Sequence, residues 1–219
     1  MNERARNAGS ARRLLYAAAT FAVAALLLAM AAPAAGGCPV CGKNLIKNPG
    51  AEAGRGVMAV GAFGAVPGWT VEAGQFGAAS YAFPNGWFSA RSIGPAKRGK
   101  NYFFGGTTTE AVTAKASIGR QVIALPGSAV GRKATLSGWI GNYGDNRTQV
   151  RAEFMDASGA VLSTVRIGPA VTIAGTDMGS RSRSGKVPAK TTQVTISVIF
   201  TGGNNYKLAG ADSLSLVLT

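Results

Sequence analysis

Acidic residues are the first candidates for chemistry in this chain, and they are few. Nine Asp and Glu stand against 23 Lys and Arg, and there is no histidine. Glycoside hydrolysis usually takes two carboxyl groups about 5–5.5 Å or 6.5–9.5 Å apart, and a Ser-His-Asp triad needs a histidine. Glu153 shares strand parity with Arg151, which predicts an outward ion pair, and the acids in or near predicted turns are Glu72, Glu110, Asp145, Asp156 and Asp177. We therefore expect no enzyme.

The two cysteines, Cys38 and Cys41, have the Cys-x-x-Cys spacing. A zinc site would need two more good ligands, and redox motifs of this spacing sit at a helix start beside a βαβ unit. Here Pro39 and Gly42 place the pair in a loop before an apolar run. Because two cysteines in an exported chain most simply form one disulfide, we predict a structural Cys38–Cys41 bond.

The N-terminus predicts export. Four arginines precede an apolar stretch from Leu14 to about Ala32, which gives way to Ala-Pro-Ala, as in a cleaved signal peptide. A membrane anchor is the alternative, since a run of about 18 apolar residues reaches the lower limit for a span. Lipidation of Cys38 is a further alternative, although Ala35 stands where lipoprotein boxes usually carry a larger aliphatic residue. We predict a signal peptide over residues 1–37 and a secreted or cell-surface protein.

The mature chain, residues 38–219, is predicted to be one basic domain without a membrane span. Four arginines and Glu3 lie in residues 1–37, so 19 of the 23 basic and 8 of the nine acidic residues remain, a net charge of +11. Such a charge attracts nucleic acid, an anionic glycan or an acidic cell-wall polymer, or it serves solubility alone.

Two basic segments stand out, "PAKRGKNYFF" at 95–104 and "SRSRSGK" at 180–186. Basic residues interleaved with aromatic ones can follow a phosphate backbone and stack on bases. Export argues against nucleic acid as the natural ligand, and the same residues would suit an anionic polysaccharide. Two solvated loops are the alternative.

Apolar residues recur with a period of two, which predicts half-buried strands. Examples are the alternations in 150–154, 194–200 and 214–218. Further predicted strands are 44–47, 69–73, 78–83, 101–105, 117–124, 133–141 and 160–167, and the weakly patterned stretches 84–100 and 168–190 are predicted loops. Short strands separated by turn pairs indicate an all-β antiparallel β-sandwich, most simply a jelly roll.

Six short stretches occur in the order seen in galactose-binding-like jelly rolls: "NLIKNPGAE" at 44–52, "VPGW" at 66–69, "SGWIGNY" at 137–143, "VRAEFMDASGAVL" at 150–162, "GKVPAKTTQVTISV" at 185–198 and "GADSLSLVL" at 210–218. In these the chain resembles the family-4, 9 and 22 type carbohydrate-binding modules and the plant proteins of domain of unknown function 642. The resemblance covers nearly all of residues 43–219. It implies a non-catalytic sandwich that binds polysaccharide or decorates a cell surface, often with a structural calcium ion.

The resemblance also implies which residues would hold calcium. In similar modules a carboxylate just after the first strand and an Asp at the start of the last strand approach one another, and the matching positions are Glu52 and Asp212. Calcium takes roughly six to eight oxygen ligands, so backbone carbonyls would complete the site. Alternatively, Glu52 accepts hydrogen bonds from turn amides and Asp212 begins a strand.

Strand parity places a candidate sugar platform at Trp139. If 133–141 is a strand, Leu136 and Ile140 point to one face, whereas Thr135, Ser137 and Trp139 point to the other. The indole could then lie flat against a pyranose ring. The alternative is that both faces of the sheet are covered and Trp139 packs under a loop.

The neighbouring polar and aromatic residues complete the predicted ligand site. Asn142 and Tyr143, on the adjoining loop, would supply hydrogen bonds, and Trp87 and Tyr102 flank the basic loop. Trp69 is expected to pack in the core or at an edge. We therefore expect a carbohydrate-binding-like module, with a structural or adhesion protein, or a glycoside hydrolase, as the alternatives.

Overall fold

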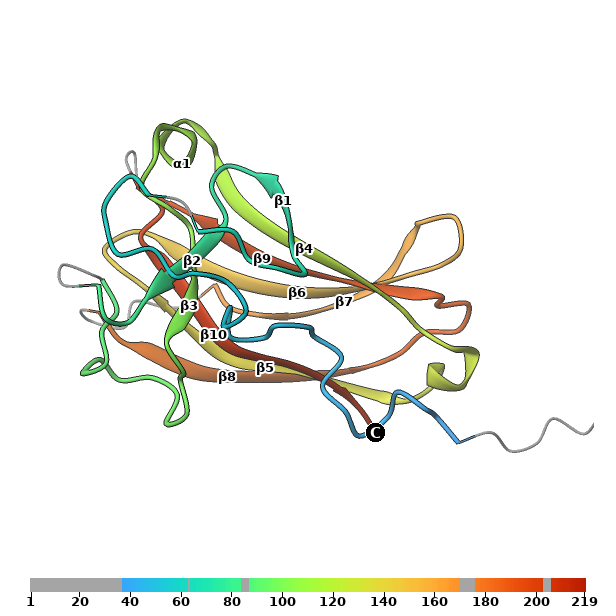
Figure 1. The fold of residues 1–219 in the computed structure, drawn as a ribbon. Coiled ribbons are helices and arrows are strands. Elements are labelled where there is room, and N and C mark those ends of the chain that lie inside the picture. Colours follow the sequence, from blue (N-terminus) through green and yellow to red (C-terminus); the bar gives the residue numbers. More distant parts are fainter. Residues whose placement is uncertain (1–36, 63, 84–86, 170–175, 203–205) are drawn as a thin grey trace, which may run out of the picture. The chain divides into compact units, whose positions relative to one another are not determined.

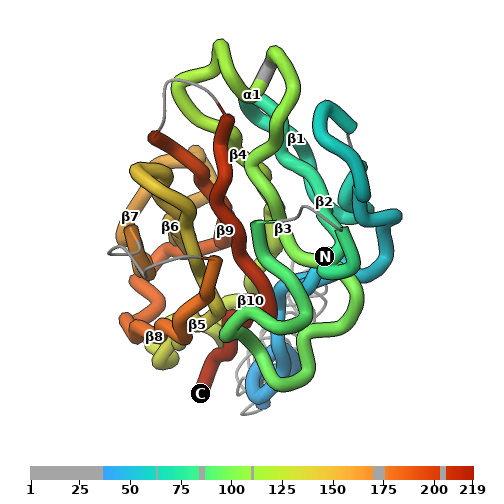
Figure 2. The backbone as a smooth tube through the Cα atoms, turned by 90° about the vertical axis from the view of Figure 1, so that its left-hand side faces the viewer, coloured from blue at the N-terminus to red at the C-terminus, as the bar shows by residue number. Residues whose placement is uncertain are grey.

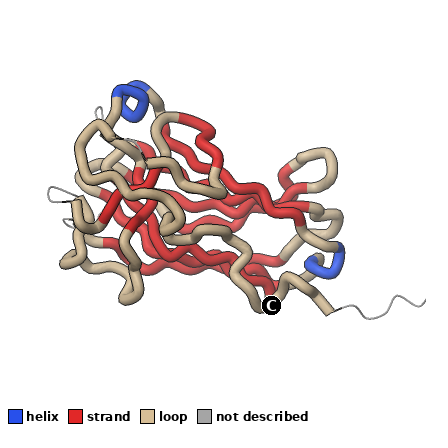
Figure 3. Tube along the Cα trace, viewed as in Figure 1, coloured by secondary structure: helices blue, strands red, loops and turns tan. Residues whose placement is uncertain are grey.

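Two antiparallel sheets make up the fold of this computed structural model, which describes residues 37–62, 64–83, 87–169, 176–202 and 206–219 (Figures 1 and 3). The predicted signal peptide lies outside these residues, apart from Gly37. One five-stranded sheet has the order β1 (Thr70–Ala73), β4 (Ala116–Ala124), β9 (Gln193–Thr201), β6 (Arg147–Met155) and β7 (Val161–Ile167). The other has the order β2 (Gly77–Ser80), β3 (Asn101–Phe104), β10 (Ala209–Leu218), β5 (Lys133–Asn142) and β8 (Met178–Lys186). The predicted jelly-roll β-sandwich is confirmed.

The core lies between the two sheets, which Figure 2 shows as two layers. Every second residue of β6 (Val150, Ala152 and Phe154) is completely buried, while Arg151 and Glu153 face outward. This is the alternation that a strand with one wet face requires. The only helices in the described chain are α1 (Thr109–Thr113) and the 3₁₀ turn η1 (Gly127–Ala129).

A second, smaller core covers the outer face of the β2–β3–β10–β5–β8 sheet. It contains Ala79, Tyr81, Phe88, Tyr102, Phe104 and Met178, with Val57, Trp87, Trp139 and Leu208 packed against it. Phe88 comes from the loop between β2 and β3 and lies directly on Gly141 and Gly210, where an added Cβ would come within 2.7 Å and 2.8 Å of its ring. The two glycines therefore let the loop dock on the sheet.

Arg98 holds this loop together, whereas the sequence predicts a basic segment that either binds an anionic polymer or is a solvated loop. Its guanidinium donates hydrogen bonds to the carbonyls of Ser89 and Ser92 at 2.9 and 2.8 Å and lies 5.2 Å from the ring centre of Tyr81. The last four residues of that segment, 101–104, form the buried strand β3.

Two predicted segments have a different secondary structure from the one expected. The run 44–47 is not a strand, although Leu45 donates a backbone hydrogen bond to Leu216 of β10. Residues 168–190, predicted as a loop, contain β8 at the edge of its sheet. An edge strand rich in arginine gives no apolar alternation and resists edge-to-edge pairing.

Residues Cys38–Thr219 form one contact unit, and the predicted Cys38–Cys41 disulfide is present. Among the described residues, no helix has the length and hydrophobicity needed to cross a bilayer.

Candidate functional site

Trp139 projects from the outer face of β5 beside a row of hydroxyl side chains. Its core-facing neighbours Leu136 and Ile140 are fully buried, whereas Trp139 is half-buried, so its predicted parity is observed. Cross-strand partners share a face, and β8 places Ser184, Ser182 and Ser180 opposite Thr135, Ser137 and Trp139, respectively. We call these six residues the Trp139 strip.

The hydroxyl side of the strip is open to solvent. Ser180, Ser182 and Ser184 are exposed, and the hydroxyls of Thr135 and Ser184 are hydrogen-bonded at 2.9 Å. Sequence reasoning missed the three serines because β8 was predicted as a loop. The alternation of Ser with Arg in "SRSRSGK" is the signal that could have revealed them.

The predicted aromatic partners gather on the same sheet face, but to different depths. Trp87 is half-buried and stacks on Phe104, with ring centres 5.1 Å apart. Tyr102 is completely buried, and burial raises the pKa of its hydroxyl. Because the β2–β3 loop covers it, Tyr102 is inaccessible to a ligand.

The two residues predicted on the adjoining loop, Asn142 and Tyr143, differ in their exposure at the end of β5. Asn142 is the last residue of β5 and is buried, and its side-chain amide donates to the carbonyl of Gly144 at 3.2 Å. Asn142 therefore does not offer its side chain to a surface ligand. Tyr143 is 46% exposed and stays available beside the strand end.

Glu52 and Asp212, predicted to approach one another, are brought together around Gly50. A Cβ at Gly50 would lie 3.0 Å from Oδ1 of Asp212 and 3.7 Å from Cγ of Glu52. Glu52 accepts hydrogen bonds from the backbone amides of Lys100 and Asn101, so it ties the β2–β3 loop to the N-terminal segment. Asp212 lies within β10, next to an irregularity in the pairing with β5.

Asp212 is a completely buried carboxylate with neutral partners. Its Oδ2 accepts a 2.8 Å hydrogen bond from the hydroxyl of Tyr81, and its Oδ1 accepts one from the amide of Ser213. Burial, with a smaller contribution from the nearby Glu52, raises the pKa of Asp212 to about 7, although the hydrogen bonds from Tyr81 and Ser213 oppose the shift.

The backbone beside both carboxylates is strained. Ala51 precedes Glu52 with φ 59°, and Ser213 follows Asp212 with φ 50°. A left-handed residue other than glycine costs on the order of 1–3 kcal/mol and persists only where its surroundings enforce it.

The donor set fits a hard cation in charge and in ligand type. Both carboxylates supply oxygen, which calcium prefers, and a cation would favour the ionised form of the buried Asp212. Among the described residues no group of three or more Asp, Glu or Cys side chains gathers, so the remaining ligands would have to be carbonyl or water oxygens.

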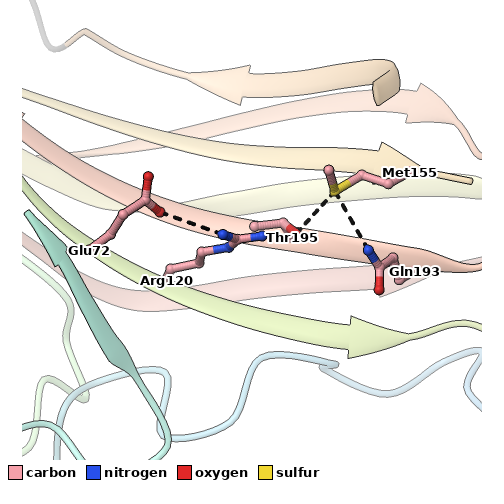
Figure 4. A network of polar contacts seen from close by, with 5 residues as sticks. All are labelled: Glu72, Arg120, Met155, Gln193 and Thr195. Carbon is pink, nitrogen blue, oxygen red and sulfur yellow. Dashed lines mark hydrogen bonds and ion pairs between the residues drawn. The ribbon is translucent and has the colours of Figure 1, made fainter. Parts of the chain in front are cut away.

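The outer face of the other sheet carries polar contacts between neighbouring strands (Figure 4). Nη1 of Arg120 lies 4.0 Å from Oε2 of Glu72, an ion pair between β4 and β1. On β6, the Sδ atom of Met155 accepts hydrogen bonds from the side chains of Thr195 and Gln193 on β9. The predicted Arg151–Glu153 ion pair is not formed, because Nε of Arg151 donates to Gln149 instead.

No protein-family model and no curated protein sequence matches the chain. Among solved structures, the enzymatically active domain of bacteriophage CBA120 tailspike protein 4 matches with a TM-score of 0.55 and 14% identity over 80% of this chain. The match spans 21% of that tailspike chain, so this chain corresponds to about a fifth of it.

Carbohydrate-binding modules occur among the similar structures, as the sequence resemblance predicted. The module TmCBM61, in complex with β-1,4-galactotriose, matches with a TM-score of 0.49 and 15% identity over 81% of this chain and 99% of that one. The C-terminal family-22 module of Clostridium thermocellum Xyn10B matches with a TM-score of 0.39 and 12% identity over 70% and 88%. These likenesses concern the fold alone, and they do not support the comparison with the plant proteins.

Proposed function

We propose that the mature chain is an exported, non-catalytic carbohydrate-binding module that holds a sugar chain on the Trp139 strip. The observation that carries the proposal is the partly buried indole of Trp139 beside exposed serine hydroxyls. A sugar ring presents an apolar C–H face and a rim of hydroxyls, and the strip offers a surface complementary to both.

The chemistry of the strip suits weak, reversible binding of a polymer. An indole contributes apolar area with a fixed orientation, and small hydroxyls both donate and accept hydrogen bonds. Tyr143, 46% exposed at the end of the same strand, adds a further polar group. The row of hydroxyls follows the strands, so a linear chain could lie along them.

A non-catalytic role agrees with the placement of the acids. Among the described side chains, the carboxylates that the fold brings together are Glu52 and Asp212, and Asp212 is fully buried. A pair of this kind has no open face for a scissile bond and water. The named tailspike neighbour is an enzymatically active domain, which keeps a hydrolase as an alternative. A structural or adhesion role without a sugar site is the other.

We propose calcium as a structural ion at Glu52 and Asp212. An ion there would tie the N-terminal segment to β10, the strand that pairs with Trp139. The role is stabilisation of this region, with no part in chemistry.

Export through the predicted signal peptide places the module outside the cytoplasm or on the cell surface. Polysaccharides of walls and capsules are encountered there, and a disulfide such as Cys38–Cys41 persists there.

A glycan array with residues 38–219, followed by affinity electrophoresis of every positive polysaccharide, tests the proposal. Trp139→Ala should abolish retention with little change in melting temperature. The matched control is Trp69→Ala: this indole packs on Phe76 and Phe103 and donates to the carbonyl of Lys47. Its loss should lower the melting temperature and leave retention of the folded fraction intact. Full retention by folded Trp139→Ala protein, or no retained polysaccharide at all, would overturn the proposal.

A further inference from the structure

An arginine-lined pocket lies where the β6–β7 edge of one sheet meets β8 of the other. Its volume is about 410 Å³, and its lining is Arg151, Glu153, Thr164, Arg166 and Arg183. Strands β7 and β8 pack closely there, since a Cβ at Gly185 would come 2.5 Å from Cγ2 of Val165. Three guanidinium groups and one carboxylate give the lining two excess positive charges.

The pocket concentrates like charge in an unusual way. Arg151 of β6 and Arg166 of β7 are direct cross-strand partners on the outward face, and like charges directly opposite each other destabilise a sheet. Within the described chain, neither Arg166 nor Arg183 forms a side-chain hydrogen bond or ion pair. Glu153 forms no ion pair there either, since the one between described residues joins Arg120 and Glu72. An anion in the pocket would relieve the repulsion.

Arg151 is held in place in a way that suits a hydrogen-bond donor to a bound anion. Its Nε already donates to the side-chain oxygen of Gln149, which holds the guanidinium and leaves its terminal nitrogens available. A guanidinium fork matches the two oxygens of a carboxylate or sulfate, whereas an ammonium group acts as a point charge.

Strand β8 joins this pocket to the Trp139 strip. Because side chains alternate along a strand, Ser180, Ser182 and Ser184 lie on the strip, while Arg183 pairs with the core-facing Leu136 and takes the opposite side. Arg183 stands three residues along β8 from Ser180, the partner of Trp139, which is about 10 Å of strand. A polysaccharide on the strip would have to pass around this edge strand for its acidic groups to reach the pocket.

We infer that the pocket binds the carboxylate or sulfate groups of an acidic polysaccharide and so selects acidic over neutral glycans. This inference rests on the proposed function, because it assumes that a sugar chain lies on the Trp139 strip. It assigns the basic segment 180–186 two roles: its serines meet the sugar rings and Arg183 meets the acidic groups.

Affinity electrophoresis against polygalacturonate, dextran sulfate and uncharged galactan, in 20–500 mM NaCl, tests the inference. The test protein is Arg166→Gln/Arg183→Gln, and the control is Arg55→Gln/Lys115→Gln, which removes the same charge from two exposed side chains outside the pocket. The wild-type protein should prefer an acidic polymer. The pocket variant should lose at least about tenfold in affinity for it and show a salt dependence weaker by about two ionic contacts, whereas the control should lose far less.

The outcomes separate this inference from the proposed function. Equal losses of affinity in both double variants, or a wild-type preference for galactan, would overturn the assignment of the pocket as a site for acidic groups. The Trp139→Ala variant would still test the strip separately. Loss in the pocket variant with full retention by Trp139→Ala would mean that the pocket binds acidic groups without a sugar chain on the strip, which would overturn the proposed function. Carboxylate and sulfate are distinguished by which acidic polymer is retained, and equal retention of single-stranded DNA would overturn the assignment to glycans.

Discussion

Trp139 of β5 and Asp212 of β10 are direct cross-strand partners, so the partly buried indole stands beside the buried carboxylate. Tyr81 covers Asp212 with its hydroxyl, at 2.8 Å, and belongs to the same outer-face cluster that supports Trp139. The candidate cation site and the candidate sugar platform are thus adjacent on one sheet. Substitutions at Asp212 are therefore expected to affect both the stability of the protein and its binding of polysaccharide.

Asp212→Asn should abolish any stabilisation by calcium. Asparagine keeps the side-chain shape and an oxygen acceptor for Tyr81, but it cannot supply an anionic ligand. Calcium should raise the melting temperature of the chelator-stripped wild-type protein and leave that of Asp212→Asn unchanged. If millimolar calcium leaves the wild-type melting temperature unchanged and calorimetric titration shows no heat of binding, the proposed calcium site is ruled out.

The metal-free protein should lose stability as the pH rises from about 4 to 7. The pKa of Asp212 is raised from 3.8 to about 7 by burial, so in this range the folded state binds more protons than the unfolded state. Stability therefore falls with rising pH, by a few kcal/mol at most, at about 1.4 kcal/mol per pH unit. Urea unfolding in chelator between pH 4 and 8 measures this, and Asp212→Asn should show a flatter profile. An equally steep profile in that variant would assign the effect to other groups.

Tyr81→Phe should destabilise the protein by about 1–3 kcal/mol, because it removes the hydroxyl that donates to a buried acceptor. The ring and its contact with Tyr102, at 4.8 Å between centres, remain. Calcium should restore part of the loss by compensating the Asp212 charge. Chemical denaturation with and without calcium is the measurement, and a loss below about 0.5 kcal/mol would mean that the hydrogen bond contributes little.

Gly141→Ala should disturb the loop that carries Phe88. The new methyl would meet the Phe88 ring at 2.7 Å and the carbonyl of Asp177 at 2.5 Å, and such overpacking costs about 1–3 kcal/mol. Gly144→Ala is the control for a glycine with no atoms near its Cβ position, although its φ of 60° adds some backbone strain. If Gly141→Ala melts like the wild type, the loop is not held on the sheet as described.

Much of the sandwich could be predicted from the alternation of apolar residues. The pattern in 133–141 correctly placed Leu136 in the core and Trp139 on the outer face, because parity is fixed once a strand is recognised. Parity carries no information about what lies above a face. The sequence therefore could not show that Phe88 and its loop bury Tyr102.

Strand β8 was missed because it carries almost no apolar signal. Most of its side chains are exposed at a sheet edge, so polar residues such as Ser and Arg can form the strand. Met178 is its single large buried residue. The arginine pocket was missed for the same reason, since Arg183 joins Arg151 and Arg166 only when β8 is placed beside β7. Asn142 was misplaced because β5 continues to that residue and turns its side chain inward.

Fluorescence of Trp139 alone tests the central claim most directly. The chain has three tryptophans, so Trp69→Phe/Trp87→Phe leaves Trp139 as the sole emitter. Acrylamide should quench it in the free protein, since the indole is only partly buried. With a saturating amount of a retained polysaccharide, the account predicts weaker quenching and a blue-shifted emission, because the sugar ring covers the indole. Unchanged quenching and emission while the same protein binds the polysaccharide would contradict it.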